Sequence, residues 1–298
     1  MSEIVVIGSV AIDSVESPYG KQEECFGGSA SYFSYAARFF APVKLIAVVG
    51  EDFPPHFREV LEEQKIDLSG LEVRKGKTFR WKGKYEGDMN VADTLDTQLN
   101  VFETFCPTIT QNSCDYLFLA NIDPRLQYDV LQKIKVKNLV ASDTMNHWIA
   151  NKHDELMQVL KHVDLLVIND MEARLLTGEQ NLVKALKRIN SFGPSQIVIK
   201  KGAHGAIAFY GGDIFTLPAY PVDDVYDPTG AGDSFAGGMI GYLAEKDAMN
   251  VTNFRTAIAY GTVVASFTVE RFSLERLREI KRETIEERLN TFRKITQF

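Results

Sequence analysis

Short apolar runs recur along the chain, and stretches with a helical spacing of apolar residues separate most of them. The runs are typical of buried strands and cover residues 4–8, 44–50, 116–120, 138–142, 164–168 and 196–200. The helical stretches between them cover residues 32–40, 54–64, 125–134 and 153–162. Apolar strands that alternate with helices predict an α/β fold, with a mostly parallel sheet and helices on both of its faces.

Residues 70 to about 100 follow a different pattern, in which apolar and polar positions alternate. Aromatic residues fall on one face (Phe79, Trp81 and Tyr85), and basic residues fall on the other (Arg80, Lys82 and Lys84). Residues 91–99 supply a further strand. A period of two predicts half-buried antiparallel strands, so we expect a small separate sheet. The basic row could contact nucleic acid, or one of its members a substrate phosphate, but we interpret it as a solvated face.

The C-terminal third adds two strands and further helices. Residues 206–210 and 213–217 are expected to extend the main sheet as an antiparallel edge. After residue 253 the chain is helical, with a face of small residues that allows close packing. Residues 275–298 are charged and amphipathic, which predicts a surface helix.

Composition and charge narrow the class of protein. The 298 residues are 45% hydrophobic, which is ample for a large core, and the net charge of −7 disfavours a nucleic-acid-binding protein. The three cysteines follow no metal or redox spacing, as in a reduced intracellular protein. With no basic leader and no apolar run of membrane length, we expect a cytoplasmic protein without a membrane partner. No repeat or linker interrupts the pattern, so residues 1–298 are predicted to form one domain that includes the small sheet.

The strongest chemical signal is Asp-Pro-Thr-Gly-Ala-Gly-Asp-Ser at residues 227–234, which a helical pattern follows at once. Gly230 and Gly232 allow close approach of a ligand, and the first N–H groups of a helix lack helical partners. These groups and the helix dipole favour an anion such as phosphate. Asp233 would repel that anion unless it accepts a proton from the group that attacks it. Alternatively, Asp233 is an ordinary first-turn residue.

Two common nucleotide-binding motifs are excluded. The only Gly-Lys-Thr lies at residues 76–78, and Leu71 stands where a P-loop needs its first Gly. Phe235 stands where a dinucleotide fingerprint needs its third Gly.

The segment from Asp227 to Phe235 resembles the C-terminal signature of the ribokinase-like, or PfkB, family of carbohydrate and nucleoside kinases. The resemblance implies a ribokinase-like three-layer sandwich with a small antiparallel β lid, inserted at about residues 12–28 and 70–105. It implies ATP as the phosphoryl donor, with Mg²⁺. It also places Asp227 near a monovalent cation site and leaves open whether K⁺ is needed.

The same resemblance implies roles within the signature. Asp233 would accept the proton of the attacking hydroxyl, and Thr229 would lie beside the nucleotide. The backbone N–H groups of Gly230, Ala231 and Gly232 would stabilise the transferring phosphoryl group.

Acceptor-binding residues are expected near the N-terminus. Asp13 is similar to the family Asp that holds hydroxyls of a sugar or ribose, although it could be a turn residue. Gly27, Gly28 and Ser29 resemble the family's N-terminal signature beside the substrate. Tyr32 stands where the family often has Asn, and this departure argues against simple ribokinase or fructose-phosphate specificity. Tyr32 and its aromatic neighbours could stack on a nucleoside base, or they could be core residues.

Nucleotide-binding residues are expected after two of the strands. Asn169 and Glu172 resemble the family's Asn-x-x-Glu motif, in which the Glu organises Mg²⁺, and the same spacing fits a helix capping box. Lys200 ends a strand, and the turn after it resembles the family's nucleotide loop, although it could be a plain hairpin turn. The residues of that turn are Lys201, Gly202 and Gly205.

The adenine pocket is expected at the last helices. Thr262 falls where the family often has Asn, and Ser273 falls where it usually has Gly.

We therefore predict an ATP-dependent kinase that phosphorylates a hydroxyl, in a primary CH₂OH group, of a sugar or sugar-like small molecule. A nucleoside kinase is the alternative within the family, and a non-catalytic ligand-binding regulator is the alternative outside it. The exposed edge of the lid allows either a monomer or a homodimer.

Overall fold

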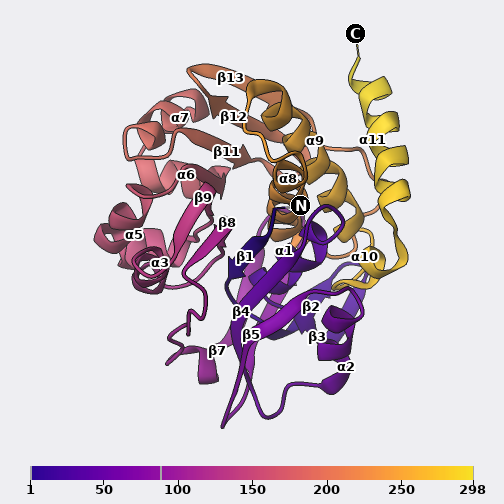
Figure 1. The fold of residues 1–298 in the computed structure, drawn as a ribbon. Coiled ribbons are helices and arrows are strands. Elements are labelled where there is room, and N and C mark those ends of the chain that lie inside the picture. Colours follow the sequence, from indigo (N-terminus) through magenta and orange to yellow (C-terminus); the bar gives the residue numbers. More distant parts are fainter. Residues whose placement is uncertain (1, 88, 298) are drawn as a thin grey trace.

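The computed structural model describes residues 2–87 and 89–297, and its main element is a nine-stranded sheet. The strand order is β13-β12-β11-β10-β9-β8-β1-β4-β5 (Figure 1). The strands are β1 (Ile4–Ile7), β4 (Val43–Gly50), β5 (Asp67–Arg74), β8 (Ser113–Leu119), β9 (Lys135–Ser142), β10 (Leu165–Asn169), β11 (Gln196–Lys200), β12 (Ala206–Tyr210) and β13 (Asp213–Leu217). Seven of them are parallel, and β12 and β13 form the antiparallel edge that the sequence predicts.

Helices cover both faces of this sheet. Ile4 and Val6 of β1 pack in one apolar cluster, whereas Val5 and Ile7 point to the opposite face and another cluster. The helices on the first side are α1 (Ser29–Ala37), α2 (Pro55–Glu62), α8 (Ala231–Lys246), α9 (Val251–Thr268), α10 (Glu275–Glu279) and α11 (Arg282–Thr296). Those on the second side are α3 (Pro124–Leu131), α4 (Asn146–Asn151), α5 (His153–Leu160), α6 (Asp170–Thr177) and α7 (Leu182–Asn190). The predicted three-layer α/β arrangement is confirmed.

A second sheet has four strands in the order β3-β2-β6-β7. They are β2 (Ala11–Ser17), β3 (Gly20–Gly27), β6 (Phe79–Tyr85) and β7 (Ala92–Gln98). The pairs β2–β3 and β6–β7 are antiparallel, as predicted, but β2 and β6 pair in parallel. This join is parallel because both strands leave the same edge of the main sheet, after β1 and after β5. We call this sheet the lid.

The lid is shorter than the sequence predicts. Residues 67–74 form β5, which pairs with β4 in the main sheet, so the predicted segment 70–105 begins too early. Past the lid, Val101 and Phe105 pack in the core beneath the main sheet. The lid strands therefore lie within residues 11–27 and 79–98.

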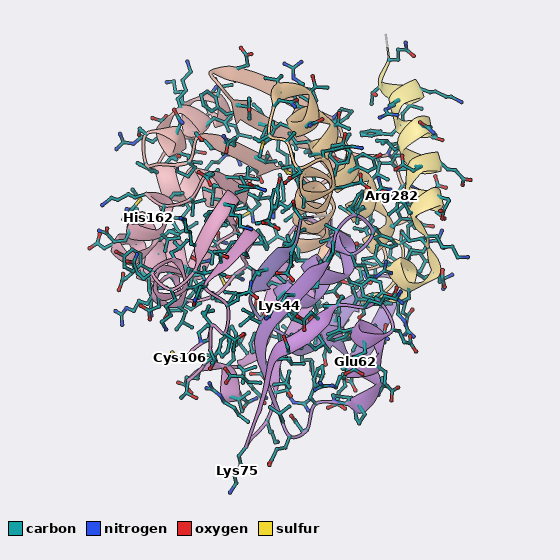
Figure 2. All side chains as sticks on the ribbon, viewed as in Figure 1. Lys44, Glu62, Lys75, Cys106, His162 and Arg282 are labelled. Atoms are coloured by element: carbon teal, nitrogen blue, oxygen red, sulfur yellow. The ribbon has the colours of Figure 1, made fainter. Side chains whose placement is uncertain are left out.

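The C-terminal region is also divided differently. The predicted helix 275–298 is two helices, α10 and α11, and its last residue lies outside the described residues. Arg282, labelled in Figure 2, pairs with Glu245 of α8 and lies 4.1 Å from the ring centroid of Phe40. This contact fixes the start of α11 against the helices of the first layer.

No helix among residues 2–87 and 89–297 is both long enough and apolar enough to cross a membrane.

Candidate active site

Four charged residues meet where the carboxyl ends of β9, β10 and β11 face the N-terminus of α8. Asp143 follows β9 directly, Glu172 lies in the first turn of α6 after β10, and Lys200 ends β11. Asp233 lies in the first turn of α8. Carboxyl ends of parallel strands share one edge of a sheet, and in α/β folds ligands bind there.

The turn before α8 has the geometry of an anion site. Gly230 is left-handed at φ 74°, and the ring of Tyr32 lies so close that a Cβ on Gly230 would be 2.2 Å from its Cγ atom. Among the described residues, the N–H groups of Gly230 and Gly232 have no acceptor, whereas the N–H of Ala231 donates to the Pro228 carbonyl at 3.1 Å. Of the three predicted anion-hole donors, two are therefore open and Ala231 is engaged in the turn.

Lys200 lies over this turn. Its Nζ atom is 2.8 Å from the position that a Cβ on Gly232 would take, and 3.5 Å from Oδ2 of Asp143. The side chain keeps 17% of its surface exposed. From the sequence, Lys200 is expected among the nucleotide-binding residues at the end of its strand, whereas Asp143 is not among the expected site residues. The usable signal was a carboxylate directly after a buried strand, at the edge where ligands bind.

Burial makes this cluster electrostatically unusual. Desolvation raises the pKa of Asp233 to about 8, and the nearby charge of Asp143 adds to this, while Lys200 acts in the opposite direction. Desolvation and Asp143 likewise raise the pKa of Glu172 to about 8. The pKa of Lys200 is also raised, because its carboxylate neighbours outweigh the desolvation that opposes them. Displaced pKa values of this kind are typical of functional sites.

Asp13 lies on β2, on the inner side of the lid, and is buried. Its carboxylate packs directly on Gly27, where a Cβ would be 1.9 Å from Oδ2. Burial, and then the charge of Asp227, raise the pKa of Asp13 to about 7. Asp13 is therefore not a turn residue, and Gly27 is the residue that makes room for it.

Gly28 and Ser29 fix the start of α1. Gly28 has φ 97°, and a Cβ there would be 2.5 Å from the Ser9 carbonyl oxygen. The N–H of Ser29 donates to Oγ of Ser9 at 3.0 Å. These contacts hold the loop after β1 beside Asp13.

The aromatic residues of α1 belong to the core. Tyr32, Phe33 and Tyr35 are all almost completely buried. Phe33 stacks on Phe118 with ring centroids 4.1 Å apart. Of the two interpretations of this segment, the core one holds, while Tyr32 also supports the turn at Gly230.

Asn169 and Glu172 form a capping box. Oδ1 of Asn169 accepts the N–H of Glu172, and Oε2 of Glu172 accepts the N–H of Asn169, both at 2.8 Å. Glu172 is buried and within electrostatic range of Asp143 and Lys200. The helix-capping interpretation is confirmed, and it leaves Glu172 facing the charged cluster.

The turn after β11 is both a hairpin and a contact point for the lid. The N–H of Lys201 donates to the Gly205 carbonyl at 2.7 Å, which closes the hairpin into β12. A Cβ on Gly202 would be 2.0 Å from Oδ1 of Asn90, which belongs to the connection between β6 and β7. The lid therefore reaches across to this turn.

A second lid contact lies at the signature. The hydroxyl groups of Tyr85 and Thr229 are 3.2 Å apart. Asp227 is buried, and its two carboxylate oxygens accept the N–H groups of Thr229 at 2.9 Å and of Ser273 at 3.1 Å. Asp227 thus ties the signature to the loop after α9.

Two predicted adenine-pocket residues are buried and already hydrogen-bonded. The hydroxyl of Thr262 donates to the Ile258 carbonyl at 2.9 Å within α9. Ser273, at φ 55°, donates its hydroxyl to the Phe26 carbonyl of β3. Both hydroxyls therefore have partners within the protein, and Ser273 joins the lid to the signature. Their role in nucleotide binding stays a prediction.

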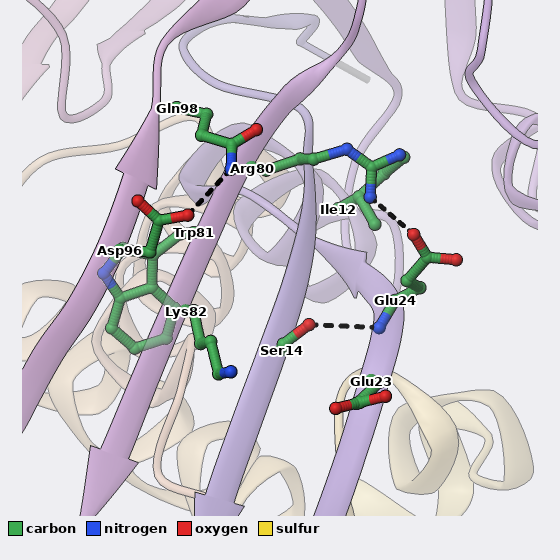
Figure 3. A pocket seen from close by; sticks show the side chains of 9 residues that line it. All are labelled: Ile12, Ser14, Glu23, Glu24, Arg80, Trp81, Lys82, Asp96 and Gln98. Atoms are coloured by element: carbon green, nitrogen blue, oxygen red, sulfur yellow. Dashed lines mark hydrogen bonds and ion pairs between the residues drawn. The ribbon is translucent and has the colours of Figure 1, made fainter.

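Figure 3 shows a different hollow, of about 270 Å³, on the outer face of the lid. Ser14 and Glu24 line it, whereas the neighbouring residues Asp13 and Cys25 point to the inner face. Arg80 pairs there with Glu24 at 2.7 Å, and Gln98 donates to Asp96 at 2.7 Å. None of the predicted site residues lines this hollow, so it is not part of the candidate active site.

Comparisons with known proteins agree with this geometry. The model of the pfkB family of carbohydrate kinases matches residues 1–279. A cytidine kinase of Thermococcus kodakarensis is 28% identical over 246 residues, which are 80% of this chain and 88% of that protein. A ribokinase of Haemophilus influenzae is 26% identical over 308 residues, covering 95% of this chain and 97% of that one. The crystal structure of aminoimidazole riboside kinase from Salmonella enterica, with aminoimidazole riboside and an ATP analogue, superposes with a TM-score of 0.77 at 18% identity, over 96% of this chain and 99% of that one.

Proposed function

Because the chain belongs to the pfkB family of carbohydrate kinases, we propose that it transfers the γ-phosphoryl group of ATP to a primary hydroxyl of a sugar or sugar-like molecule. One observation carries this proposal. Asp233 lies in the first turn of α8, directly beside the open N–H groups of Gly230 and Gly232 and within electrostatic range of Lys200. This arrangement offers a proton acceptor and phosphoryl-binding donors in one place.

The proposed reaction is an in-line displacement. The acceptor oxygen forms a bond to the γ-phosphorus, the bond from that phosphorus to the ADP oxygen breaks, and the hydroxyl proton passes to Asp233. Asp13, buried on the inner face of the lid, is proposed to hold other hydroxyls of the acceptor. The loose transition state demands little of the nucleophile, so positioning and charge supply most of the rate.

Backbone groups of the protein would stabilise the negative charge on the phosphoryl group during transfer. The N–H groups of Gly230 and Gly232 would donate to phosphoryl oxygens, and each such donor is worth roughly 3 kcal/mol in comparable anion holes. The dipole of α8 adds to this effect at its N-terminus.

The residues fit a magnesium ion that arrives with ATP. Such an ion neutralises phosphate charge and keeps most of its ligands from phosphate and water, so it needs few protein carboxylates. No group of three or more His, Cys, Asp or Glu residues in the described chain could hold a metal alone. Glu172, whose position the capping box fixes, is proposed to support the ion. A monovalent cation near Asp227 stays a prediction.

Two lid contacts favour water exclusion during transfer. Tyr85 meets Thr229 of the signature, and Asn90 meets the turn at Gly202. With the lid in this position, the reacting groups are shielded from water that would otherwise hydrolyse ATP.

A nucleoside is the second candidate acceptor. The similarity to a cytidine kinase over 80% of the chain favours it, whereas the buried aromatic residues of α1 provide no stacking surface.

A homodimer through the lid is also proposed, since Val91 and Leu95 at the β7 edge are more than half exposed.

The test is ADP release from MgATP with a panel of sugars, sugar phosphates, polyols and nucleosides, with and without K⁺. We expect one acceptor class to stimulate release many-fold over the rate without acceptor. A panel that leaves ADP release at the background rate, while ATP still binds, would contradict the proposal and favour a regulatory protein.

A further inference from the structure

Lys200 has fewer partners than a buried structural lysine needs. An ammonium group carries three N–H donors, and within residues 2–87 and 89–297 that of Lys200 makes one hydrogen bond, to Oδ2 of Asp143, which is long at 3.5 Å. The exposed lid pair Arg80–Glu24 is closer, at 2.7 Å. A largely buried cation with open donors is costly unless another acceptor completes it.

The position of Lys200 identifies that acceptor. Its Nζ atom would lie 2.8 Å from a Cβ placed on Gly232, so the ammonium is packed directly against the anion turn. A phosphoryl group bound by the N–H groups of this turn would therefore lie within reach of the ammonium. Lys200 ends β11, whereas the N–H donors lie at the start of α8 and in the turn before it, so the two elements would contact the phosphoryl group from different sides.

We propose that Lys200 is a catalytic residue that donates to the oxygens of the phosphoryl group during transfer, and that Asp143 is a positioning residue for it. This inference rests on the proposed kinase function. A flexible point charge can follow the phosphoryl group as it moves from ADP to the acceptor oxygen. Because negative charge spreads over the equatorial oxygens in the transition state, Lys200 acts mainly on turnover and not on nucleotide binding.

The test compares Lys200→Met, which removes the charge, with Lys200→Arg, which keeps it. For Lys200→Met we expect kcat to fall about 100-fold or more, as for loss of one anion-hole donor. The dissociation constant of MgADP should stay within about threefold of the wild-type value, because ADP lacks the transferred group. Lys200→Arg should recover part of the lost kcat.

The matched control is Lys44→Met. Lys44, labelled in Figure 2, is also buried and paired, with Asp67 at 4.0 Å, but it lies near the start of β4, at the opposite edge of the sheet. Its loss should leave kcat unchanged. Lys200→Gln is made alongside Lys200→Met, and circular dichroism selects the variants that fold.

Asp143 is tested by a double-mutant cycle. Asp143→Asn alone should lower kcat about tenfold, and it should have little further effect in the Lys200→Met background, because residues that act through one another are not additive. Fully multiplicative losses would show that Asp143 does not act through Lys200.

Two results would overturn the inference, and they are distinguishable from failure of the proposed function. If Asp233→Asn is inactive but Lys200→Met keeps kcat within about threefold of the wild type, Lys200 does not touch the transferred group. If Lys200→Met weakens MgADP binding as much as it lowers kcat, Lys200 only holds the nucleotide. A wild-type protein that phosphorylates no acceptor removes both proposals together.

Discussion

The outer face of the lid and the edge of the main sheet at α8 both carry clusters of charged side chains, but the two regions differ in how these side chains are paired. On the lid, Arg80 is shared between Glu24 at 2.7 Å and Asp52 at 3.1 Å. At the sheet edge, the ammonium of Lys200 faces several carboxylates, and its hydrogen bond to Asp143 is 3.5 Å long.

This difference indicates which of the two regions can bind a charged ligand. Exposed pairs on the lid are complete, so they gain little from a further partner. The cluster at the sheet edge is short of both hydrogen-bond acceptors and cations. Within the described part of the chain, the N–H donors of Gly230 and Gly232 are open, and the carboxylate of Asp233 has a raised pKa. A phosphate with its cation would complete both parts of this cluster.

The largest effect is expected from Asp233→Asn. The change removes the proton acceptor but keeps size, so we expect kcat to fall about 10³-fold, within the usual range for a general base. MgATP binding, measured by calorimetry, should persist. Turnover near the wild-type level in the folded variant would remove Asp233 from the base role.

The next effect concerns the support of Asp13. Gly27→Ala places a methyl group 1.9 Å from the position of Oδ2 of Asp13, so the carboxylate must move. A displacement of about 1 Å commonly costs on the order of 100-fold in rate, and we expect kcat/KM for the acceptor to fall by about that much. Asp13→Asn, which removes the charge without a clash, is the matched variant and should raise the acceptor KM. An unchanged acceptor KM in both variants would exclude Asp13 from acceptor binding.

Buried carboxylates should also make the protein sensitive to pH. Asp233 and Glu172 have pKa values raised to about 8, so in the ligand-free protein Asp233 is largely protonated below that pH and kcat/KM should rise with pH. The folded state holds these protons more tightly than the unfolded state, so their contribution to stability is present at acid pH and is lost as pH rises through about 8.

The measurement is the melting temperature of the ligand-free protein between pH 5 and pH 9. Wild type should lose stability toward alkaline pH, and Asp233→Asn should lose less, because one titrating group is gone. Equal slopes for the two proteins would show that Asp233 is not desolvated in the ligand-free state.

The smallest effect is expected on the lid surface. Glu24→Gln breaks the ion pair with Arg80, but the side chain of Glu24 is 71% exposed and Arg80 keeps Asp52. We expect less than about 1 kcal/mol of lost stability, by urea unfolding, and no change in turnover. A large loss of activity would mean that the outer face of the lid contributes to the active site.

Much of the fold could be predicted because strands buried on both faces leave continuous apolar runs. The run at 196–200 coincides with β11. β5 was placed in the lid because it is an edge strand whose polar and apolar residues alternate, with Val73 58% exposed. α7 was not predicted, although Asn181 caps its start and Leu182, Ala185, Leu186 and Ile189 follow the spacing of one helix face. The break between α10 and α11 at Ile280 could not be predicted, because no Pro or Gly marks the end of α10 in the sequence.

The site was predictable where its residues are close in sequence. Residues 227–233 carry the turn, the donors and the acidic residue in one segment, so the resemblance could be recognised directly. Asp143 stands alone after a strand, and only the tertiary structure brings it to Lys200. The close approach of Lys200 to Gly232 likewise joins two elements that are distant along the chain.

The most direct test of the central claim is mass spectrometry of candidate acceptors after incubation with MgATP and either the wild-type protein or Asp233→Asn. We expect one sugar or nucleoside to gain a single phosphoryl group with the wild type, and to remain unmodified with the variant over the same time. An acceptor phosphorylated equally by both proteins, or no phosphorylated acceptor with either, would contradict the assignment of Asp233 and the kinase function, respectively.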